Sequence, residues 1–267
     1  MAYKIRADLH VHTNISDGSY SSKAIIDMAK SKGIDVIAIT NHDTTKGIDE
    51  AKEYGKEIGI RVIGGVEISA YDFENNRKVH IIGLGLNSYS KNIEKICKRI
   101  RYDRNENTKW QLNKIIQLGY EINSEKIYEK SIESGVLYKQ HIMEELIRKG
   151  YTDRIYSDLY RKLFKGDGIC SRDIEYVDVK EAIKCIKADC GIAVLAHPGQ
   201  LNSYGIIKEL VQCGLDGVEI NHPSHNEEDI KKIKAIAKEY SLMLTGGSDF
   251  HGKYGDCKNY LGMELCP

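Results

Sequence analysis

The first 85 residues alternate between short apolar runs and stretches in which apolar residues recur every three or four positions. The apolar runs suit strands and the periodic stretches suit helices. The pattern predicts strands over residues 3–9, 35–39, 61–67 and 78–84, with helices over 22–32 and 48–58. Such an alternation is typical of parallel strands joined by crossover helices.

The last hundred residues repeat this scheme. They predict helices over 179–188, 204–213 and 226–240, and strands over 192–196, 217–220 and 242–245. The middle of the chain differs, because only helical patterns occur there, broken at Gly119, Gly135, Gly150 and Gly166. We therefore expect an α/β barrel built from residues 1–90 and 173–267, with a helical insert over 91–172.

Potential metal ligands gather in three short runs that each follow an apolar stretch. The runs are Asp8–His12 with Ser16–Gly18, then Thr40–Asp43, and near the end Gly247–His251. Residues two apart in a strand point the same way, so His10 and His12 can face one point. Neutral imidazole and carboxylate together suit divalent transition metals. The runs therefore predict a metal site.

The same side chains fall at the ends of predicted strands, where a (β/α) barrel carries its catalytic groups. His80 is the exception, because it lies within the fourth predicted strand. The others follow or close their strands: His10, His12, His42, Glu67, His197 and Asp249.

Composition narrows the remaining possibilities only a little. Lys+Arg and Asp+Glu both number 39 in 267 residues, so net charge indicates neither nucleic acid nor another strongly charged partner. No apolar run reaches 18 residues and the start lacks an apolar signal core, so we expect a cytoplasmic protein without a membrane partner. The seven cysteines form no C-x-x-C pair, and we expect reduced thiols. Oligomeric state stays open.

Five ordered motifs together resemble the PHP (polymerase and histidinol phosphatase) family of metal-dependent phosphoesterases. They are Asp-x-His-x-His from Asp8, Thr-Asn-His-Asp from Thr40, Gly-Val-Glu-Ile-Ser from Gly65, Ala-His-Pro-Gly from Ala196 and Gly-Ser-Asp-Phe-His from Gly247. The resemblance implies a distorted seven-stranded (β/α) barrel. The helical insert is similar to that of the nucleotide-phosphatase and RNA-end exonuclease branch of the family.

The resemblance also implies three divalent metal ions, with Mn²⁺, Fe²⁺ and Zn²⁺ all compatible with the ligand types. By this comparison His10, His12, Glu67 and Asp249 hold one ion. Glu67 bridges to a second ion, which His80 and His197 complete, while Asp17, His42 and His251 hold the third. Three divalent ions less three carboxylates leave about +3, which favours a phosphate substrate and a metal-bridged hydroxide as its attacking group.

Other residues are candidates for the chemistry around the metals. His225 is favoured as a leaving-group acid or phosphate contact, with His222 beside it, although both could simply be solvent-exposed. We place Asp43 with His225 among the catalytic residues. Asp8 and Asp43 are expected to orient histidines, and Glu219 could do the same.

In the insert, the candidates for contacting substrate are Lys139, His141 and Arg172. We expect the insert to join the barrel after a strand on the catalytic side and to form a lid over the metals. The related branch has Arg where this chain has Lys139, and often Arg where it has Gln200. Arg grips phosphate with two parallel donors, whereas Lys is a point charge and Gln is neutral. The reaction class is therefore implied more firmly than the nucleotide.

The sequence thus predicts a phosphoesterase that hydrolyses a phosphomonoester of a small phosphorylated substrate. Candidates are a nucleotide, such as a nucleoside 3′,5′-bisphosphate or AMP, and a short RNA end. The alternatives are a histidinol-phosphate-type phosphatase, a metal-dependent amidohydrolase, and a catalytically inert module supporting a nucleic-acid complex. An amidohydrolase would want a bridging lysine at a strand end, and none is evident.

Overall fold

The computed structural model describes residues 5–256 and 258–267, so the first residues of the predicted strand 3–9 and Cys257 lie outside the described residues. The strands are β1 (Ala7–Val11), β2 (Val36–Ile39), β3 (Arg61–Asp72), β4 (Arg77–Leu84), β5 (Val177–Asp178), β6 (Ile192–Leu195), β7 (Gly217–Asn221) and β8 (Met243–Gly246). The helices are α1 (Ser22–Ser31), α2 (Ile48–Ile58), α3 (Lys91–Gln117), α4 (Ser124–Lys130), α5 (Lys139–Arg148), α6 (Asp158–Phe164), α7 (Val179–Ala188), α8 (Pro198–Leu201), α9 (Ile207–Gln212) and α10 (Glu227–Tyr240), with 3-10 turns η1 (Tyr204–Ile206) and η2 (Gly252–Tyr254).

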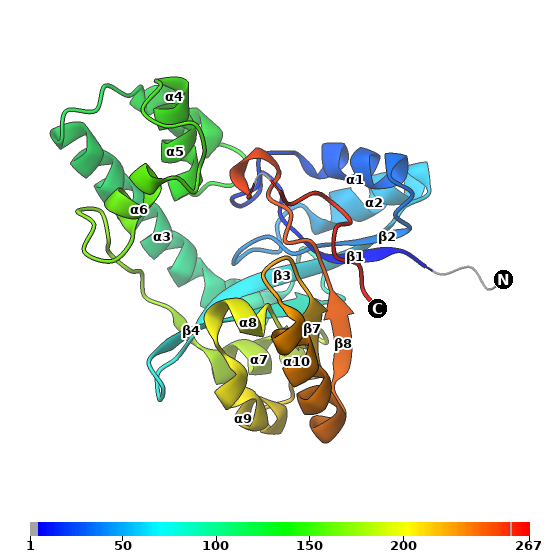
Figure 1. Cartoon of the computed structure of the whole chain (residues 1–267). Coiled ribbons are helices and arrows are strands. Elements are labelled where there is room, and N and C mark those ends of the chain that lie inside the picture. Colours follow the sequence, from blue (N-terminus) through cyan, green and yellow to red (C-terminus); the bar gives the residue numbers. More distant parts are fainter. Residues whose placement is uncertain (1–4, 257) are drawn as a thin grey trace.

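Seven strands pair in the order β1-β2-β3-β4-β6-β7-β8, and the short β5 pairs with β3 outside this path. The ring closes where Val11 bridges Phe250 and the His12 amide donates to the Phe250 carbonyl at 3.0 Å. Helices α1 and α2 cover one side of the sheet, and α7 to α10 cover another (Figure 1). The predicted α/β fold with a seven-stranded barrel is confirmed.

One strand runs against the predicted direction. β4 is antiparallel to both β3 and β6, whereas every other pair in the ring is parallel. Only residues 73–76 separate β3 from β4, which is enough for a hairpin but far too short for a crossover helix. The reversal explains why His80 lies inside its strand: the start of β4, not its end, lies at the face where the other strands terminate.

The buried carboxylate of Asp8 ties the two ends of the barrel together. It accepts the Ser248 amide at 2.9 Å, the Ser248 hydroxyl at 2.6 Å and the Gly262 amide at 2.8 Å. These donors come from the chain after β8, while Asp8 lies in β1. Asp8 therefore fixes the strand that carries His10 and His12 against the segment that carries Asp249.

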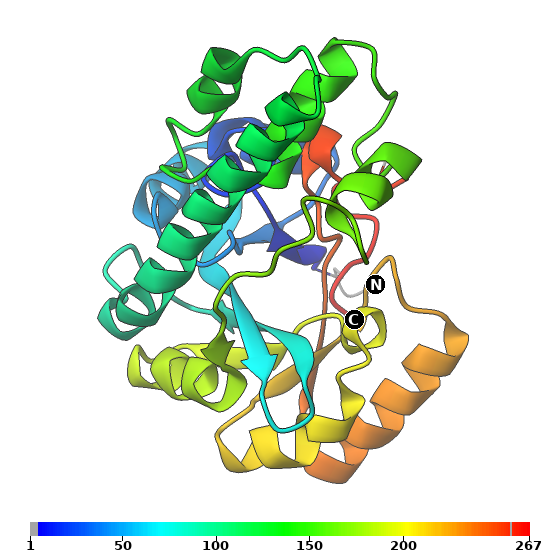
Figure 2. The ribbon, with the colours of Figure 1, turned by 90° about the vertical axis from the view of Figure 1, so that its left-hand side faces the viewer.

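Residues 91–172 contain α3 to α6 and, among the described residues, no strand. With 27 residues, α3 is about 40 Å long. Its first half packs into the barrel core through Ile93, Cys97 and Ile100, and its second half packs into a separate core with α5 and α6 through Leu112 and Ile115. Figure 2 shows this helix crossing the molecule diagonally, with the other insert helices beside its far end.

The expectation that the insert leaves the barrel on the catalytic side is wrong. Leu84, at the end of β4, pairs with Gly65 near the start of β3, so the chain leaves β4 at the face opposite the ligand residues. The chain returns at β5, which pairs with Ala70 and Tyr71 in the second half of β3. The insert therefore begins at one end of the barrel and rejoins it near the other.

No helix in the described part of the chain has the length and apolar character needed to cross a bilayer. The six cysteines within the described residues are free thiols, in line with the expected reduced state.

Gly247 packs against the β1 backbone at His10. A Cβ added to Gly247 would be 2.5 Å from the backbone nitrogen of His10. We predict that Gly247→Ala lowers the free energy of unfolding by about 1–3 kcal/mol, because the barrel seam must open to admit the methyl group. Urea unfolding of the metal-free protein measures this loss. The control is Gly205→Ala, whose added Cβ meets only Arg77 Nη1 at 3.8 Å. Equal stability of both variants would contradict this account of the seam.

Candidate metal centre

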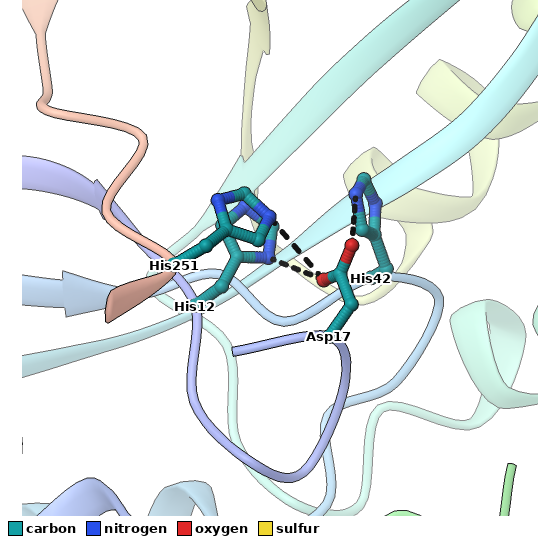
Figure 3. A group of neighbouring side chains, drawn as sticks. All are labelled: His12, Asp17, His42 and His251. Atoms are coloured by element: carbon teal, nitrogen blue, oxygen red, sulfur yellow. Dashed lines mark ion pairs between the residues drawn. The ribbon is translucent and has the colours of Figure 1, made fainter. Parts of the chain in front are cut away.

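The loop after β1 folds back so that Asp17 faces the histidines of the strand. An added Cβ at Gly18 would be 2.5 Å from the His12 carbonyl oxygen, so only glycine allows this close return. Asp17 then lies among His12, His42 and His251, with its Oδ1 3.3 Å from His251 Nε2 and its Oδ2 3.8 Å from His42 Nε2 (Figure 3). One carboxylate and three imidazoles thus converge from three segments of the chain.

A second group forms where β1 meets β3 and the segment after β8. Both His10 Nε2 and His12 Nε2 face Glu67 Oε2, at 3.3 and 3.1 Å, and Asp249 Oδ1, at 3.4 and 3.3 Å. This is the pair of strand histidines expected to point at one place. The spacing of two residues along β1 produces the convergence.

Glu67 lies at the centre of the whole arrangement and is 1 % exposed. Its Oε1 is 2.7 Å from His80 Nδ1 and 2.9 Å from His197 Nε2, while its Oε2 is 3.2 Å from His42 Nδ1. The structure therefore brings together all nine residues proposed from the sequence as ligands. The groupings differ slightly, because His12 also joins the Asp17 group and His42 also joins Glu67 and His80.

The donor set fits divalent metal ions. Asp17, Glu67 and Asp249 place three carboxylates among six imidazoles, and burying like charges this close is unfavourable without cations. Several buried atoms of the cluster also have no hydrogen-bond partner among the described residues: His12 Nδ1, Asp17 Oδ1, His42 Nδ1, His197 Nδ1, His222 Nε2 and Asp249 Oδ1. Metal coordination would satisfy such atoms, so the geometry indicates a site for several metal ions.

The pKa values of the cluster report the same surplus of negative charge. Burial disfavours the charged imidazole of His10, but Glu219, Asp249 and Glu67 outweigh burial and raise its pKa well above the usual value. At His251, Asp17 and Asp249 likewise outweigh burial and raise the pKa to about 10. Burial prevails at His42 and lowers its pKa to about 4. The cluster therefore attracts protons when no metal is bound.

Glu219 orients the ligand histidines from behind. Its Oε1 is 3.2 Å from His10 Nδ1, and its Oε2 accepts the His197 amide at 2.8 Å. A carboxylate on one ring nitrogen of His10 leaves the other nitrogen facing Glu67 and Asp249, as is common for ligand histidines.

Asp43, expected among the catalytic residues, has its carboxylate engaged elsewhere. Its Oδ1 accepts the Ser69 amide at 2.8 Å, and its Oδ2 accepts the Ser69 hydroxyl at 3.0 Å and Arg104 Nη2 at 2.7 Å. Arg101 donates to the Asp43 carbonyl at 2.7 Å. Asp43 thus fixes the loop that carries His42, and two arginines of α3 hold it there.

The loop after β7 places its two histidines differently. His225 Nδ1 lies 2.8 Å from the Ile220 carbonyl, and His225 Nε2 accepts the Gly199 amide at 3.2 Å, so backbone groups occupy both ring nitrogens. His222 is 5 % exposed, and its Nε2 lies 3.5 Å from Asp249 Oδ2. Of the two, His222 faces the cluster.

The insert reaches the cluster through the first turn of α5. Gln140 donates its side-chain amide to Asp17 Oδ2 at 3.0 Å. His141 is buried, its Nδ1 accepts the Tyr138 amide at 3.3 Å, and burial lowers its pKa to about 4. Arg172 instead lies against α3, where it donates to Asn107 Oδ1 at 2.7 Å and stacks 4.4 Å from the centre of the Trp110 ring.

A cavity of about 410 Å³ opens onto the cluster. The barrel contributes His222, Asp249 and His251 to its lining, and the insert contributes Tyr156, Tyr160 and Lys165. Sequence reasoning missed Gln140 and these three insert residues, because in a helical segment they look like ordinary surface positions. The only sequence signal near Tyr156, Tyr160 and Lys165 was the pair of glycine breaks at 150 and 166, which enclose these three residues and mark the segment as irregular.

Comparisons with known proteins agree with this geometry. The sequence profile of the PHP domain matches residues 8–240. The chain is 46 % identical, over 93 % of its length and 95 % of the relative, to a phosphoribosyl 1,2-cyclic phosphate 1,2-diphosphodiesterase of Eggerthella lenta. It is 31 % identical to a 5′-3′ exoribonuclease of Haemophilus influenzae (91 % and 89 % covered) and 27 % identical to a 3′,5′-nucleoside bisphosphate phosphatase of Chromobacterium violaceum (91 % and 86 % covered).

Among solved structures, a proposed metal-dependent phosphoesterase of Bifidobacterium adolescentis superposes with a TM-score of 0.89 at 28 % identity. The match covers 97 % of this chain and 92 % of that one. The whole arrangement of barrel and insert is therefore shared with that protein.

Glu67 touches five other candidate ligands, so its charge should be needed for metal retention. We predict that Glu67→Gln loses most bound metal and most of the metal-induced rise in Tm, a rise of roughly 5–10 °C if metal contributes about 2.7 kcal/mol. Elemental analysis after dialysis and thermal unfolding with and without Mn²⁺ measure both effects.

Glu53→Gln, an exposed substitution on α2, is the control and should behave as wild type. A Glu67→Gln protein with wild-type metal content would contradict the central role of this carboxylate.

Proposed function

This chain belongs to the PHP domain family of metal-dependent phosphoesterases, and on that premise we propose that it hydrolyses a phosphoester carried by a phosphorylated ribose. The observation that supports this most is the convergence of the nine ligand residues in one cluster, with Glu67 at its centre, in a chain 46 % identical to a phosphoribosyl cyclic phosphate diesterase. We take a phosphoribosyl cyclic phosphate as the first candidate substrate.

A nucleoside 3′,5′-bisphosphate is the second candidate, because a bisphosphate phosphatase and an exoribonuclease are also related over most of the chain. AMP and short RNA ends remain further candidates within this class. All of these molecules present a phosphate on ribose. We therefore expect the enzyme to select its substrate through the sugar phosphate more than through a base.

We propose three metal ions. Asp17, His42 and His251 would hold one, His10, His12, Glu67 and Asp249 a second, and Glu67 with His80 and His197 a third. When bound, divalent ions would polarise the phosphoryl oxygens and lower the pKa of a water molecule toward neutrality. The chain's own residues then fix the geometry: Glu219 orients His10, and Asp43 holds the His42 loop. The donor types suit manganese, iron or zinc.

His222 is the better placed hydrogen-bond donor for the leaving oxygen. Its Nδ1 accepts the Ser224 amide at 3.1 Å, so in the neutral ring the N–H lies on Nε2, which faces Asp249 and the cavity and can stabilise the negative charge that develops on that oxygen. His225 supports the loop through the backbone contacts described above. We assign the donor role to His222 and the supporting role to His225.

The insert serves as a lid in this proposal. Gln140 contacts Asp17 directly, and Tyr156 and Tyr160 line the cavity opposite Asp249. Substrate that reaches the metals must therefore pass between barrel and insert. An inert module would not need a complete ligand set beside an open cavity, and the related enzymes described above are named for substrates that carry phosphate on ribose. We therefore rank an inert module and a histidinol-phosphate-type phosphatase below the proposed activity.

We expect about three metal ions per chain, one for each ligand group, when the protein is purified with Mn²⁺ or Zn²⁺. Inductively coupled plasma analysis of dialysed protein, scaled to amino-acid analysis, gives the ratio. One ion or fewer per chain would contradict the three-metal assignment.

The activity itself is tested with Mn²⁺ by following substrate loss and product formation over five substrates: phosphoribosyl 1,2-cyclic phosphate, adenosine 3′,5′-bisphosphate, AMP, a short 5′-phosphorylated RNA and histidinol phosphate. Chromatography with ³¹P NMR is the readout, because opening a cyclic phosphate releases no inorganic phosphate. We expect the phosphorylated ribose compounds to exceed histidinol phosphate in kcat/KM by at least about tenfold, which is about 1.4 kcal/mol of transition-state binding. His222→Ala should lower kcat on the preferred substrate by about 10²-fold. A preference for histidinol phosphate, or no turnover of any substrate, would overturn the proposal.

A further inference from the structure

Three lysines from separate segments lie near the place where the insert meets the barrel. Lys78 lies in β4, Lys139 begins α5, and Lys165 follows α6. Each of the two insert lysines sits over a neighbouring ring, Lys139 over Phe164 at 5.8 Å and Lys165 over Tyr160 at 5.9 Å. The centres of these two rings are 5.4 Å apart. Lys165 also lines the cavity that contains Asp249 and His251.

Their positive charge is only partly balanced. Asp173 accepts from Lys78 Nζ at 2.9 Å and from the Tyr176 hydroxyl at 2.7 Å. Within residues 5–256 and 258–267, Lys139 and Lys165 make no salt bridge. Three ammonium groups therefore share one carboxylate, in a place where two of the side chains are held by aromatic packing rather than by anions.

The electrostatics agree with this count. Lys139 is half-buried, and burial together with Arg104, Lys165 and Lys78 lowers its pKa to about 8. Burial and Lys78 also lower the pKa of Lys165, so an anion placed beside the two insert lysines would stabilise both charges.

The strand register sets the distance from the metals. Lys78 and His80 are two residues apart in β4, so their side chains leave the same face of the strand about 7 Å apart. His80 pairs across the sheet with Ser69, and Lys78 pairs with Tyr71. On this face of the sheet, Lys78 therefore lies beyond the ligands Glu67 and His80. The separation of about 7 Å between Lys78 and His80 is close to the span of a sugar ring.

From these observations we propose that Lys78, Lys139 and Lys165 form a second anion subsite, which binds a phosphate on the substrate remote from the one that is hydrolysed. The inference rests on the proposed function and deepens it, because it requires a substrate with two phosphates separated by a pentose. It also gives Lys139 a defined role: it recognises the spectator phosphate as a point charge, within a group of lysines that replaces a two-pronged arginine.

The experiment compares adenosine 3′,5′-bisphosphate with adenosine 3′-phosphate, which lacks the second phosphate. We expect wild-type kcat/KM to favour the bisphosphate by tenfold or more. Lys139→Met and Lys165→Met should each lower kcat/KM for the bisphosphate about ten- to a hundredfold, mainly through KM, and change the monophosphate less than threefold. Lys139→Arg should retain most of the activity.

The matched control is Lys162→Met, because Lys162 is an exposed residue of α6 and is not among the charges that act on Lys139. Equal losses on both substrates, or no loss on either, would overturn the subsite.

A binding measurement separates failure of the subsite from failure of the proposed function. Isothermal titration of metal-free protein with ribose 5-phosphate should show binding that Lys139→Met weakens at least tenfold and Lys162→Met leaves unchanged. If neither adenosine compound is hydrolysed but this pattern holds, the subsite stands and the reaction assignment fails. If ribose 5-phosphate binds wild type and Lys139→Met equally, the subsite is wrong whatever the activity.

Discussion

Three carboxylates crowded into one cluster of histidines are the constraint on which the rest of this structure depends. Asp17, Glu67 and Asp249 come from different parts of the chain, and gathering their negative charges in one place is unfavourable unless cations lie among them. The barrel holds them together regardless, through the Asp8 hydrogen bonds at its seam and through Glu219 and Asp43 behind the ligands. Much of the fold therefore serves to keep a repulsive arrangement ready for metal.

Strain in the backbone follows from the same constraint. Asp43, His197 and Asp249 all adopt positive φ, at 56°, 25° and 49°, a region that side-chain-bearing residues seldom occupy. Each of the three stands where a strand has just ended and its chain must turn toward Glu67. Packing and hydrogen bonds around the cluster hold these conformations, so three of the seven positive-φ residues other than glycine in the described part of the chain flank the metal site.

The sequence was a good guide to whatever repeats locally or carries ligand chemistry. The helices at 48–58 and 179–188 have the predicted bounds, and the nine ligand residues converge as expected. It was a poor guide to the direction of strands and to where side chains point. The pattern of β4 reads the same in either orientation, and only the short link over 73–76 indicated a hairpin. Nothing in the order of residues shows that His225 turns toward backbone while His222 faces the metals, or that Arg172 stacks on Trp110.

Helix α3 belongs to both the barrel core and the insert core, and this limits how substrate can reach the metal site. A flap that joins its domain through two adjacent ends can swing as a unit about that hinge. Here the chain leaves the barrel at one end and returns near the other, and a single unbroken helix is packed into both cores. Swinging the whole insert would require this helix to bend or to leave the barrel core. We therefore expect substrate to enter between barrel and insert without the insert swinging as a unit, past the cavity residues Tyr156 and Lys165. Such an enzyme would select substrates by the width of the opening as well as by the charges within it.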